Sequence, residues 1–423
     1  MPSARPPRQV AQDPWIALIG TLDTKGEEIA YVRDRLRALG ARPIVIDTGI
    51  LGEPAGITPD VSHAEVASAA GDALEEVRAA GSRGAAVERM LAGVRAVCLG
   101  LFEDGRLDGA LCLGGAEGGL MGAGAMHALP VGVPKLIVTP SASGRREFAP
   151  FMGETDTMVM HSVVDILGLH PISRAIFDNA AAAIAGMARD GGGAVGHLGE
   201  RTVGVTMLGQ TTPGVMRLRE RLLDAGHTPV VFHANGVGGP AMEKLAASGA
   251  LAGVVDYTLS ELANSLMDGV HATGPERLRV AGRHALPQVV VPGCCDFFNQ
   301  GARDTVPERY RDRKSYFHNP VAALVRLSAE EGVELGRMIA ERLSASTGPV
   351  CVVVPARGFS LADAAGGDLY DPPADRAFID ALRAALRPDF AYEEVDAHVD
   401  DPAFADLVAD RYLTLVKEPI HAG

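Results

Sequence analysis

The sequence of 423 residues has few cysteines, few aromatic residues and no long apolar run, and each shortage narrows the class of protein. Its five cysteines form no CxxC pair, and most lie in or beside aliphatic segments, so we expect reduced thiols rather than disulfides. No stretch of about 18 apolar residues occurs, and the first 13 residues lack the apolar segment of a secretion signal. We therefore expect a cytoplasmic protein with no membrane partner.

Basic residues are also in short supply. The chain has 39 Lys and Arg against 53 Asp and Glu, which gives a formal net charge of -14 at pH 7. Because a nucleic-acid surface needs clustered Lys and Arg to neutralise phosphates, we expect no nucleic-acid partner. An acidic chain can still bind a nucleotide, since a few local donors and a metal ion are enough to hold one.

Glycine is abundant, with 50 residues placed mostly in short loops between aliphatic runs. An apolar run at 15–20 is followed by apolar residues at helical spacing from 29 to 39, and then by a β-branched run at 43–47. This pattern predicts a βαβ unit. Continuous apolar strands are typical of a parallel sheet that helices cover on both faces.

The same alternation continues to the end of the chain and predicts an α/β protein with two Rossmann-like lobes, mostly parallel doubly wound sheets and an inter-lobe cleft. The predicted boundaries are a disordered leader at 1–13, an N-terminal lobe at 14–190, a glycine-rich connector at 191–200 and a C-terminal lobe at 201–423. Further strands are predicted at 109–113, 135–139, 156–165, 253–257, 288–291, 350–355 and 390–395. Helices are predicted at 62–80, 84–101, 117–128, 172–189, 213–225, 239–248, 259–268, 320–343, 374–386 and 401–415.

The opening pattern occurs a second time. Residues 203–236 align without gaps with residues 17–50 at a constant shift, so that Gly40 matches Gly226 and Asp47 matches His233. We interpret this as a repeated βαβ unit at the start of each lobe, although shared strand and helix constraints would account for part of the match.

In open parallel sheets, ligands bind beyond the carboxyl ends of the strands, where helix N-termini present N–H groups to anions. In the first lobe, Lys25 is a candidate partner for a phosphate, Asp23 for a bound Mg²⁺ and Asp47 for a ribose hydroxyl. The alternatives are a helix cap at Asp23 and a turn at Asp47, and the spacing matches neither GxxxxGK[ST] nor GxGxxG. The candidate binding residues of this lobe are Gly20, Thr21, Asp23, Thr24, Lys25, Asp47, Gly114, Gly115, Gly118, Gly119, Thr139, Ser141, Ser143 and Arg145.

The second lobe has similar loops. HANGVGG at 233–239 offers Gly236, Gly238 and Gly239 as further binding residues. His233, at the repeat position of Asp47, is a candidate acid, base or metal ligand, and the alternative is a structural role. Arg357 is a candidate clamp for a carboxylate or phosphate, or else an arginine that pins its loop.

Several separate motifs, in order along nearly the whole chain, resemble the uncharacterised UPF0261 proteins, also described as Tm-1-like ATP-binding domain proteins. The motifs are IGTLDTKGEE at 19–28, VIDTGI at 45–50, HANGVGGPAMEKL at 233–245, DTVPERY at 304–310, FHNP at 317–320 and VPARGFSLAD at 354–363. The resemblance implies two Rossmann-like subdomains, bound ATP with or without Mg²⁺, and a homodimer. The sequence departs from the family pattern at Asn235 and at the adjacent Cys294 and Cys295. Because a TIM-barrel domain follows this region in multidomain relatives, a separate TIM-barrel partner is a further expectation.

Three functions follow as hypotheses. The first is an ATP-binding protein in which the nucleotide controls assembly. The second is a metabolic enzyme that acts on a small carboxylated or phosphorylated substrate in the inter-lobe cleft, and it requires His233 and Arg357 to converge on one anion. The third is a dinucleotide oxidoreductase, against which the missing GxGxxG counts.

Overall fold

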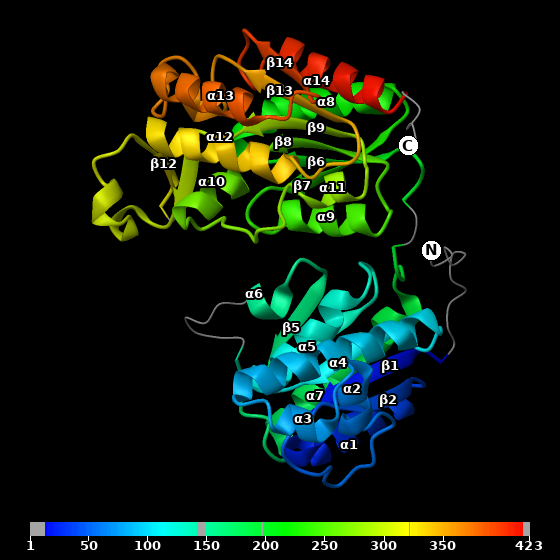
Figure 1. The fold of residues 1–423 in the computed structure, drawn as a ribbon. Helices are drawn as coiled ribbons and strands as arrows, with labels where there is room; N and C mark the ends of the chain where they lie inside the picture. Colours follow the sequence, from blue (N-terminus) through cyan, green and yellow to red (C-terminus); the bar gives the residue numbers. More distant parts are fainter. Residues whose placement is uncertain (1–12, 142–148, 196–197, 321, 418–423) are drawn as a thin grey trace. The chain divides into compact units, whose positions relative to one another are not determined.

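The computed structural model describes residues 13–141, 149–195, 198–320 and 322–417, and the chain divides into two compact units, Met1–Gly196 (unit 1) and His197–Gly423 (unit 2). Each unit contains a parallel sheet with helices on both of its faces (Figure 1). The predicted α/β class with two Rossmann-like folds is confirmed. No helix within the described ranges combines the length and apolar character needed to cross a bilayer.

Unit 1 is built on a five-stranded parallel sheet with the order β2-β1-β3-β4-β5. Its elements in chain order are β1 (Trp15–Gly20), α1 (Leu22–Ala38), β2 (Arg42–Asp47), α2 (His63–Ala69), α3 (Leu74–Arg78), α4 (Arg83–Glu103), β3 (Gly109–Leu113), α5 (Ala116–Ala128), β4 (Lys135–Thr139), α6 (Ala149–Met152), β5 (Thr157–His161) and α7 (Pro171–Asp190). Instead of the single helix predicted at 62–80, α2 and α3 are separated at Gly71, which has a φ of +88° that favours glycine.

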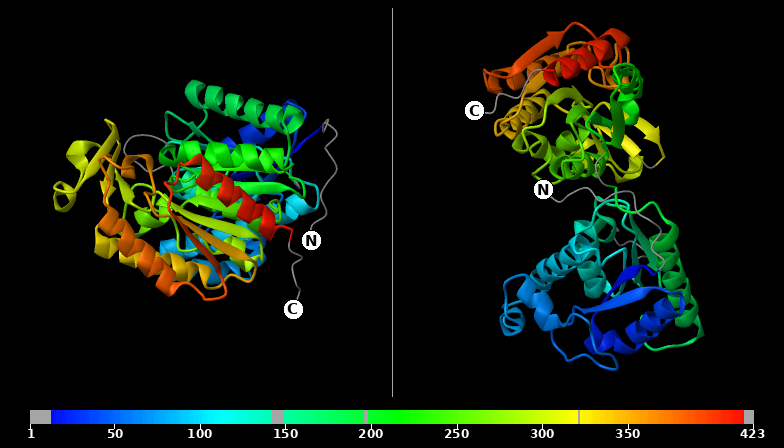
Figure 2. Two further views of the ribbon diagram at one scale, coloured as in Figure 1. Left: turned by 90° about the horizontal axis from the view of Figure 1, so that it is seen from above. Right: turned by 90° about the vertical axis from the view of Figure 1, so that its right-hand side faces the viewer.

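Successive residues of β1 point to opposite faces of the sheet and divide the core of unit 1 in two. Ile16 and Leu18 pack with α1 and α7, whereas Ala17 and Ile19 pack with α2, α4 and α5. Figure 2 shows these helices on the two sides of the sheet. Aliphatic contacts thus fix both layers and leave the two ends of the strands for loops.

Unit 2 contains a six-stranded parallel sheet with the order β14-β13-β9-β8-β6-β7 and a small antiparallel sheet with the order β10-β12-β11. Its first elements are β6 (Thr202–Met207), η1 (Gly209–Thr211), α8 (Thr212–Asp224), β7 (Thr228–His233), α9 (Gly238–Ala247), β8 (Gly253–Thr258), α10 (Ser260–Met267), α11 (Val280–Arg283), β9 (Gln288–Gly293) and β10 (Phe297–Gln300). They are followed by η2 (Arg303–Thr305), η3 (Glu308–Tyr310), β11 (Ser315–Asn319), β12 (Ala322–Arg326), α12 (Ala329–Leu343), β13 (Val350–Pro355), η4 (Leu361–Asp363), α13 (Pro372–Ala385), β14 (Ala391–Val395) and α14 (Pro402–Leu415). Helices α8 and α14 cover one face of the large sheet, and α10, α12 and α13 pack on the other.

The helix predicted at 320–343 is wrong in its first part. Residues 322–326 form β12, which pairs with β10 and β11, and the helix starts only after Ser328. The Oγ of Ser328 accepts the N–H of Glu331, and the Glu331 carboxylate accepts the N–H of Ser328, which is a capping box. The S-x-x-E motif at residues 328–331 is therefore the sequence signal for the true start of the helix.

The two units begin with matching βαβ segments, as the repeat predicts. Strands β2 and β7 occupy equivalent positions, and helices α1 and α8 both end at equivalent residues. Gly40 and Gly226 follow these helices with φ values of +78° and +79°, a conformation in which a residue with a Cβ is strained. In each unit the chain crosses from one side of the first strand to the other after the second strand. In unit 1, β2 and β3 lie on opposite sides of β1, and in unit 2, β7 and β8 lie on opposite sides of β6.

Candidate functional site

The loops that leave β1, β3 and β4 meet at the start of α5 in unit 1. A Cβ built on Gly118 would lie 3.6 Å from Thr21 Cγ2, and one built on Gly119 would lie 3.6 Å from Thr139 Oγ1. The turn itself needs glycine at position 114, where a Cβ would be 2.4 Å from the Gly119 nitrogen. This is the point where the strand order reverses, which is the usual ligand position in such sheets.

The first turn of α5 presents backbone N–H groups that bond nothing in the part of the chain that the structure describes. Gly115 is the N-cap residue and supplies no side chain. The Gly119 N–H bonds the Gly115 carbonyl oxygen at 2.8 Å, whereas the N–H groups of Ala116, Glu117 and Gly118 bond no other residue in the described ranges. Ala116 is exposed and Gly115 is partly exposed, so solutes can reach this helix end. The free N–H groups and the helix dipole together favour an anion there.

The N-terminus of α1, which follows β1, is occupied by a carboxylate of the protein. Asp47 is fully buried at the end of β2, and its Oδ1 accepts the N–H of Leu22 at 3.0 Å and that of Gly49 at 2.8 Å. Burial raises the pKa of Asp47, and the two backbone hydrogen bonds oppose this shift. The structure thus gives Asp47 the predicted turn role through one oxygen.

The other residues predicted in the β1 loop mainly hold neighbouring segments. Asp23 Oδ2 accepts the N–H of Gly52 at 3.2 Å, and Lys25 Nζ donates to the carbonyl oxygen of Ile166. The hydroxyls of Thr21 and Thr24 lie 3.0 Å apart. A Cβ on Gly20 would lie 2.7 Å from Ile29 Cδ1, so glycine at this position is required by core packing.

The loop after β4 is only partly described. Thr139 is fully buried, and its Oγ1 accepts the N–H of Ser141 at 3.2 Å. Ser143 and Arg145, which the sequence also suggests as anion ligands, lie outside the described residues. Of the candidate residues in this loop, Thr139 lies close to the start of α5, next to Gly119.

In unit 2 the glycine-rich loop HANGVGG is occupied by an internal carboxylate. Glu261 Oε1 accepts the N–H of Gly236 at 3.0 Å and that of Gly239 at 3.1 Å. A Cβ on Gly239 would lie 2.0 Å from Glu261 Oε2, and one on Gly238 would lie 2.0 Å from the carbonyl oxygen of His233. The glycines of this loop let the backbone approach an anion closely, and in this structure that anion is a carboxylate of the protein itself.

A buried arginine holds this carboxylate in place. Arg277 is 1% exposed; its Nε donates to Glu261 Oε2 at 2.6 Å and its Nη2 donates to Asp256 Oδ1 at 2.6 Å. Glu243 lies 3.9 Å from Arg277, and burial raises the pKa of Glu243 to about 7 against the opposing charge of Arg277. The first turn of α8 is filled in a similar way, because Asp400 Oδ1 accepts the Gly214 N–H at 2.9 Å.

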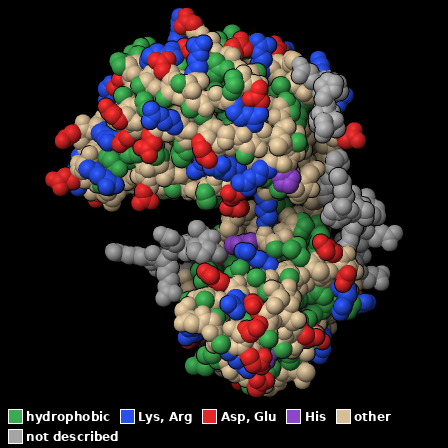
Figure 3. Space-filling view, viewed as in Figure 1, with side chains coloured by type: hydrophobic (Ala, Val, Ile, Leu, Met, Phe, Trp, Pro, Cys, Tyr) green, Lys and Arg blue, Asp and Glu red, His purple; other side chains and the backbone are tan. Residues whose placement is uncertain are grey.

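The structure does not bring His233 and Arg357 together. His233 ends the edge strand β7, whereas Arg357 follows β13, and β6, β8 and β9 lie between these strands. Arg357 is 64% exposed and pairs with Asp396 at 2.5 Å. Figure 3 shows acidic and basic side chains interspersed over the visible face of unit 2. The prediction that these two side chains converge on one anion is therefore wrong.

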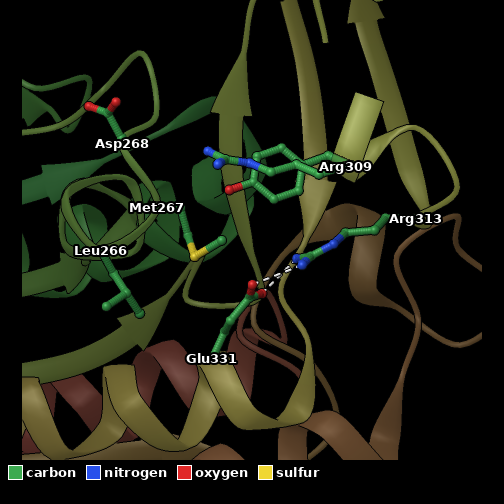
Figure 4. Close-up of a pocket in the computed structure, with 7 residues that line it drawn as sticks. Leu266, Met267, Asp268, Arg309, Arg313 and Glu331 are labelled. Carbon is green, nitrogen blue, oxygen red and sulfur yellow. Dashed lines mark hydrogen bonds and ion pairs between the residues drawn. The ribbon is translucent and has the colours of Figure 1, made fainter. Parts of the chain in front are cut away.

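Unit 2 contains a cavity of about 350 Å³ (Figure 4). Leu266 and Met267 contribute from the C-terminal end of α10, and Arg313 and Glu331 close one wall with an ion pair at 2.6 Å. Because Arg313 and Glu331 neutralise each other, this ion pair gives the cavity wall no net charge. Over the described part of the chain, no three His, Cys, Asp or Glu residues are arranged to hold a metal ion.

Sequence reasoning missed the internal carboxylates of unit 2 because their partners are distant in the chain. Glu261 and Arg277 lie in stretches without a recognisable motif, and Asp400 is 186 positions from Gly214. The sequence contains one indication of the buried cluster, because Asp256 is a charged residue within the otherwise uncharged strand sequence GVVDYT. A charged residue in a buried strand requires a buried partner.

Together, the two doubly wound parallel sheets with helix N-termini at their carboxyl edges define a Rossmann-like α/β protein of two units. The model of the uncharacterised protein family UPF0261 N-terminal domain matches residues 14–191, and that of the UPF0261 C-terminal domain matches residues 200–416. The chain belongs to the UPF0261 family.

Full-length relatives support this assignment. A UPF0261 protein of Clostridium tetani is 37% identical over 405 residues, which cover 95% of this chain and 99% of the relative. A UPF0261 protein of Mesorhizobium japonicum is 38% identical over 398 residues, or 93% and 97% of the two chains. The ToMV resistance protein Tm-1(GCR237) of Solanum lycopersicum is 31% identical over 437 residues, which cover 97% of this chain but 57% of the tomato protein.

Proposed function

We propose that the chain binds a phosphate-bearing small molecule at the N-terminus of α5, and that this ligand is ATP, as the family resemblance implies. The observation that carries the proposal is a contrast between helices. In α1, α8 and α9, first-turn N–H groups bond Asp47, Asp400 and Glu261. The first turn of α5 contains Glu117, but its carboxylate pairs with Arg83. Among the described residues no carboxylate bonds the first-turn N–H groups of α5, and its glycine loop leaves room for a phosphate.

The surroundings of α5 favour binding over turnover. Hydroxyl groups of Thr21 and Thr139 border the site, while Asp23 and Lys25 are engaged with neighbouring backbone. In this proposal Mg²⁺ binds together with the ATP phosphates. Asp23 is its candidate protein ligand once the hydrogen bond from the Gly52 N–H to Asp23 is broken. Control of assembly by the bound nucleotide and a cytoplasmic location belong to the same proposal.

Placing a carboxylate at the start of α5 is expected to abolish this site without unfolding unit 1. In Gly115→Asp, the new side chain caps the Gly118 N–H and repels phosphate, and a Cβ at this position meets no atom within 4 Å. We expect ATP affinity to fall at least tenfold, or about 1.4 kcal/mol, in isothermal titration calorimetry.

Gly115→Asn is the matched control, because asparagine caps the same N–H without charge. It is expected to bind ATP several-fold more tightly than Gly115→Asp does. Equal affinity of the wild type and Gly115→Asp would move the site away from α5. A wild-type protein that binds neither ATP nor inorganic triphosphate would contradict the proposed function as a whole.

A further inference from the structure

At the exit of β2, three buried polar atoms have no hydrogen-bond partner among the residues that the structure describes. They are Asp47 Oδ2, Thr48 Oγ1 and His63 Nδ1, and the exposed fractions of these residues are 0%, 0% and 6%. Buried polar groups in native proteins are nearly always paired, with protein, water or ligand. Asp47 Oδ2 and His63 Nδ1 face each other at 3.5 Å as an ion pair without a hydrogen bond, so all three atoms keep hydrogen-bonding capacity for a polar ligand.

The geometry at Asp47 defines the chemistry of that partner. Its Oδ1 is engaged by two backbone N–H groups, so only Oδ2 is available, and it lies 3.5 Å from His63 Nδ1. The other ring nitrogen of His63 lies 3.8 Å from Glu53, a residue of the exposed loop. A carboxylate oxygen accepts hydrogen bonds, whereas a threonine hydroxyl and a ring nitrogen can each donate or accept. Adjacent hydroxyl groups complement this set, whereas a phosphate would be repelled by Asp47.

This polar group is adjacent to the phosphate site proposed above. Strands β2, β1 and β3 are consecutive in the sheet, and a strand spacing of about 4.8 Å places the exits of β2 and β3 about 10 Å apart. Asp47 bonds the N–H of Leu22, and the preceding residue, Thr21, borders Gly118 of α5. A nucleotide with its phosphates at α5 can thus extend across β1 toward β2.

We propose that Asp47, Thr48 and His63 bind the vicinal hydroxyls of the ligand's ribose, so that the site selects ribonucleotides over deoxyribonucleotides. This inference depends on the proposed phosphate site. The loop after β2 is held to Asp23 by the hydrogen bond that the Gly52 N–H donates, and the Leu51 side chain of this loop is 75% exposed. The sugar reaches Asp47 when this loop moves outward.

The test compares ATP, 2′-deoxy-ATP, 3′-deoxy-ATP and inorganic triphosphate by calorimetry on the wild-type chain. We expect ATP to bind at least tenfold more tightly than either deoxy analogue. In Thr48→Val, which replaces the hydroxyl by a methyl group, and in His63→Gln, the preference for ATP is expected to fall while the affinity for inorganic triphosphate stays unchanged.

Equal affinity of the wild type for ATP and both deoxy analogues would overturn the ribose inference and leave the phosphate site intact, with water as the partner of the three atoms. A preference that persists undiminished in both variants would also overturn it. Failure of ATP and inorganic triphosphate alike to bind would refute the phosphate site, and the ribose inference with it.

Discussion

Replacing Arg277 by methionine is expected to lower the free energy of unfolding of unit 2 by about 3–5 kcal/mol, because it leaves buried carboxylates without their cation. Asp256 and Glu261 both bond Arg277 directly, and all three residues are at most 2% exposed. Glu261 also organises the glycine loop after β7. Loss of the guanidinium therefore removes the charge that holds this loop closed.

Denaturant unfolding of the full chain, followed by far-ultraviolet circular dichroism, measures this effect. Trp15 is the only tryptophan and lies in unit 1, so its fluorescence follows that unit separately. Arg357→Met is the matched control, since Arg357 also pairs with an aspartate but is 64% exposed, and an ion pair that exposed to water contributes little to stability. Similar unfolding midpoints for the two variants would contradict the account of the buried cluster.

Unit 2 is expected to lose stability as the pH rises from about 6 to 9. Arg326 is surrounded by the carboxyl groups of Asp296, Asp363 and Asp375, all at most 5% exposed. Burial is the main cause that raises the pKa of Asp363 to about 9 and that of Asp375 to about 6. One guanidinium cannot compensate three buried negative charges, so the folded state retains protons that the unfolded chain releases.

The direction of the pH effect follows from proton linkage. A carboxyl group with a raised pKa in the folded state contributes stability below its unfolded pKa of about 3.9, and this contribution is lost as the pH rises through the folded pKa. For Asp363 the loss continues up to about pH 9, because the folded state holds a proton that the unfolded chain has released. Denaturant unfolding at a series of pH values measures the slope.

Asp363→Asn is expected to flatten this dependence, because asparagine does not titrate, and to exceed the wild type in stability near pH 9. The matched control is Asp396→Asn, since Asp396 is 78% exposed and Arg357 lowers its pKa. This control is expected to keep the wild-type slope between about pH 6 and 9. An unchanged slope in Asp363→Asn would show that Asp363 does not carry the buried proton.

Much of the fold could be predicted from the sequence because its signals are local. The apolar run at 15–20 and the helical spacing that follows it define a βαβ unit, and the repeat carries the same arrangement to unit 2. The small sheet was missed because residues 322–326, which form β12, are short and aliphatic, and they read equally well as the start of α12. Pairing with distant strands decided between these two structures.

The candidate site was only partly predictable for a similar reason. Composition identified the glycine loops at 114–119 and 236–239, but it could not show which loop holds an internal carboxylate. That distinction depends on Glu261, 22 positions from Gly239, and on the buried Arg277. The approach of Asp47 Oδ2 and His63 Nδ1 to 3.5 Å likewise depends on the course of the loop between these residues.

Hydrogen–deuterium exchange of the full chain with and without ATP tests the central claim most directly. We expect ATP to slow exchange of the Ala116, Glu117 and Gly118 amides, which have no partner among the described residues. Peptides over Gly236 and Gly239 should be unaffected, because Glu261 already binds those amides. Protection confined to the loop of unit 2, or no protection at α5 under saturating ATP, would contradict the account.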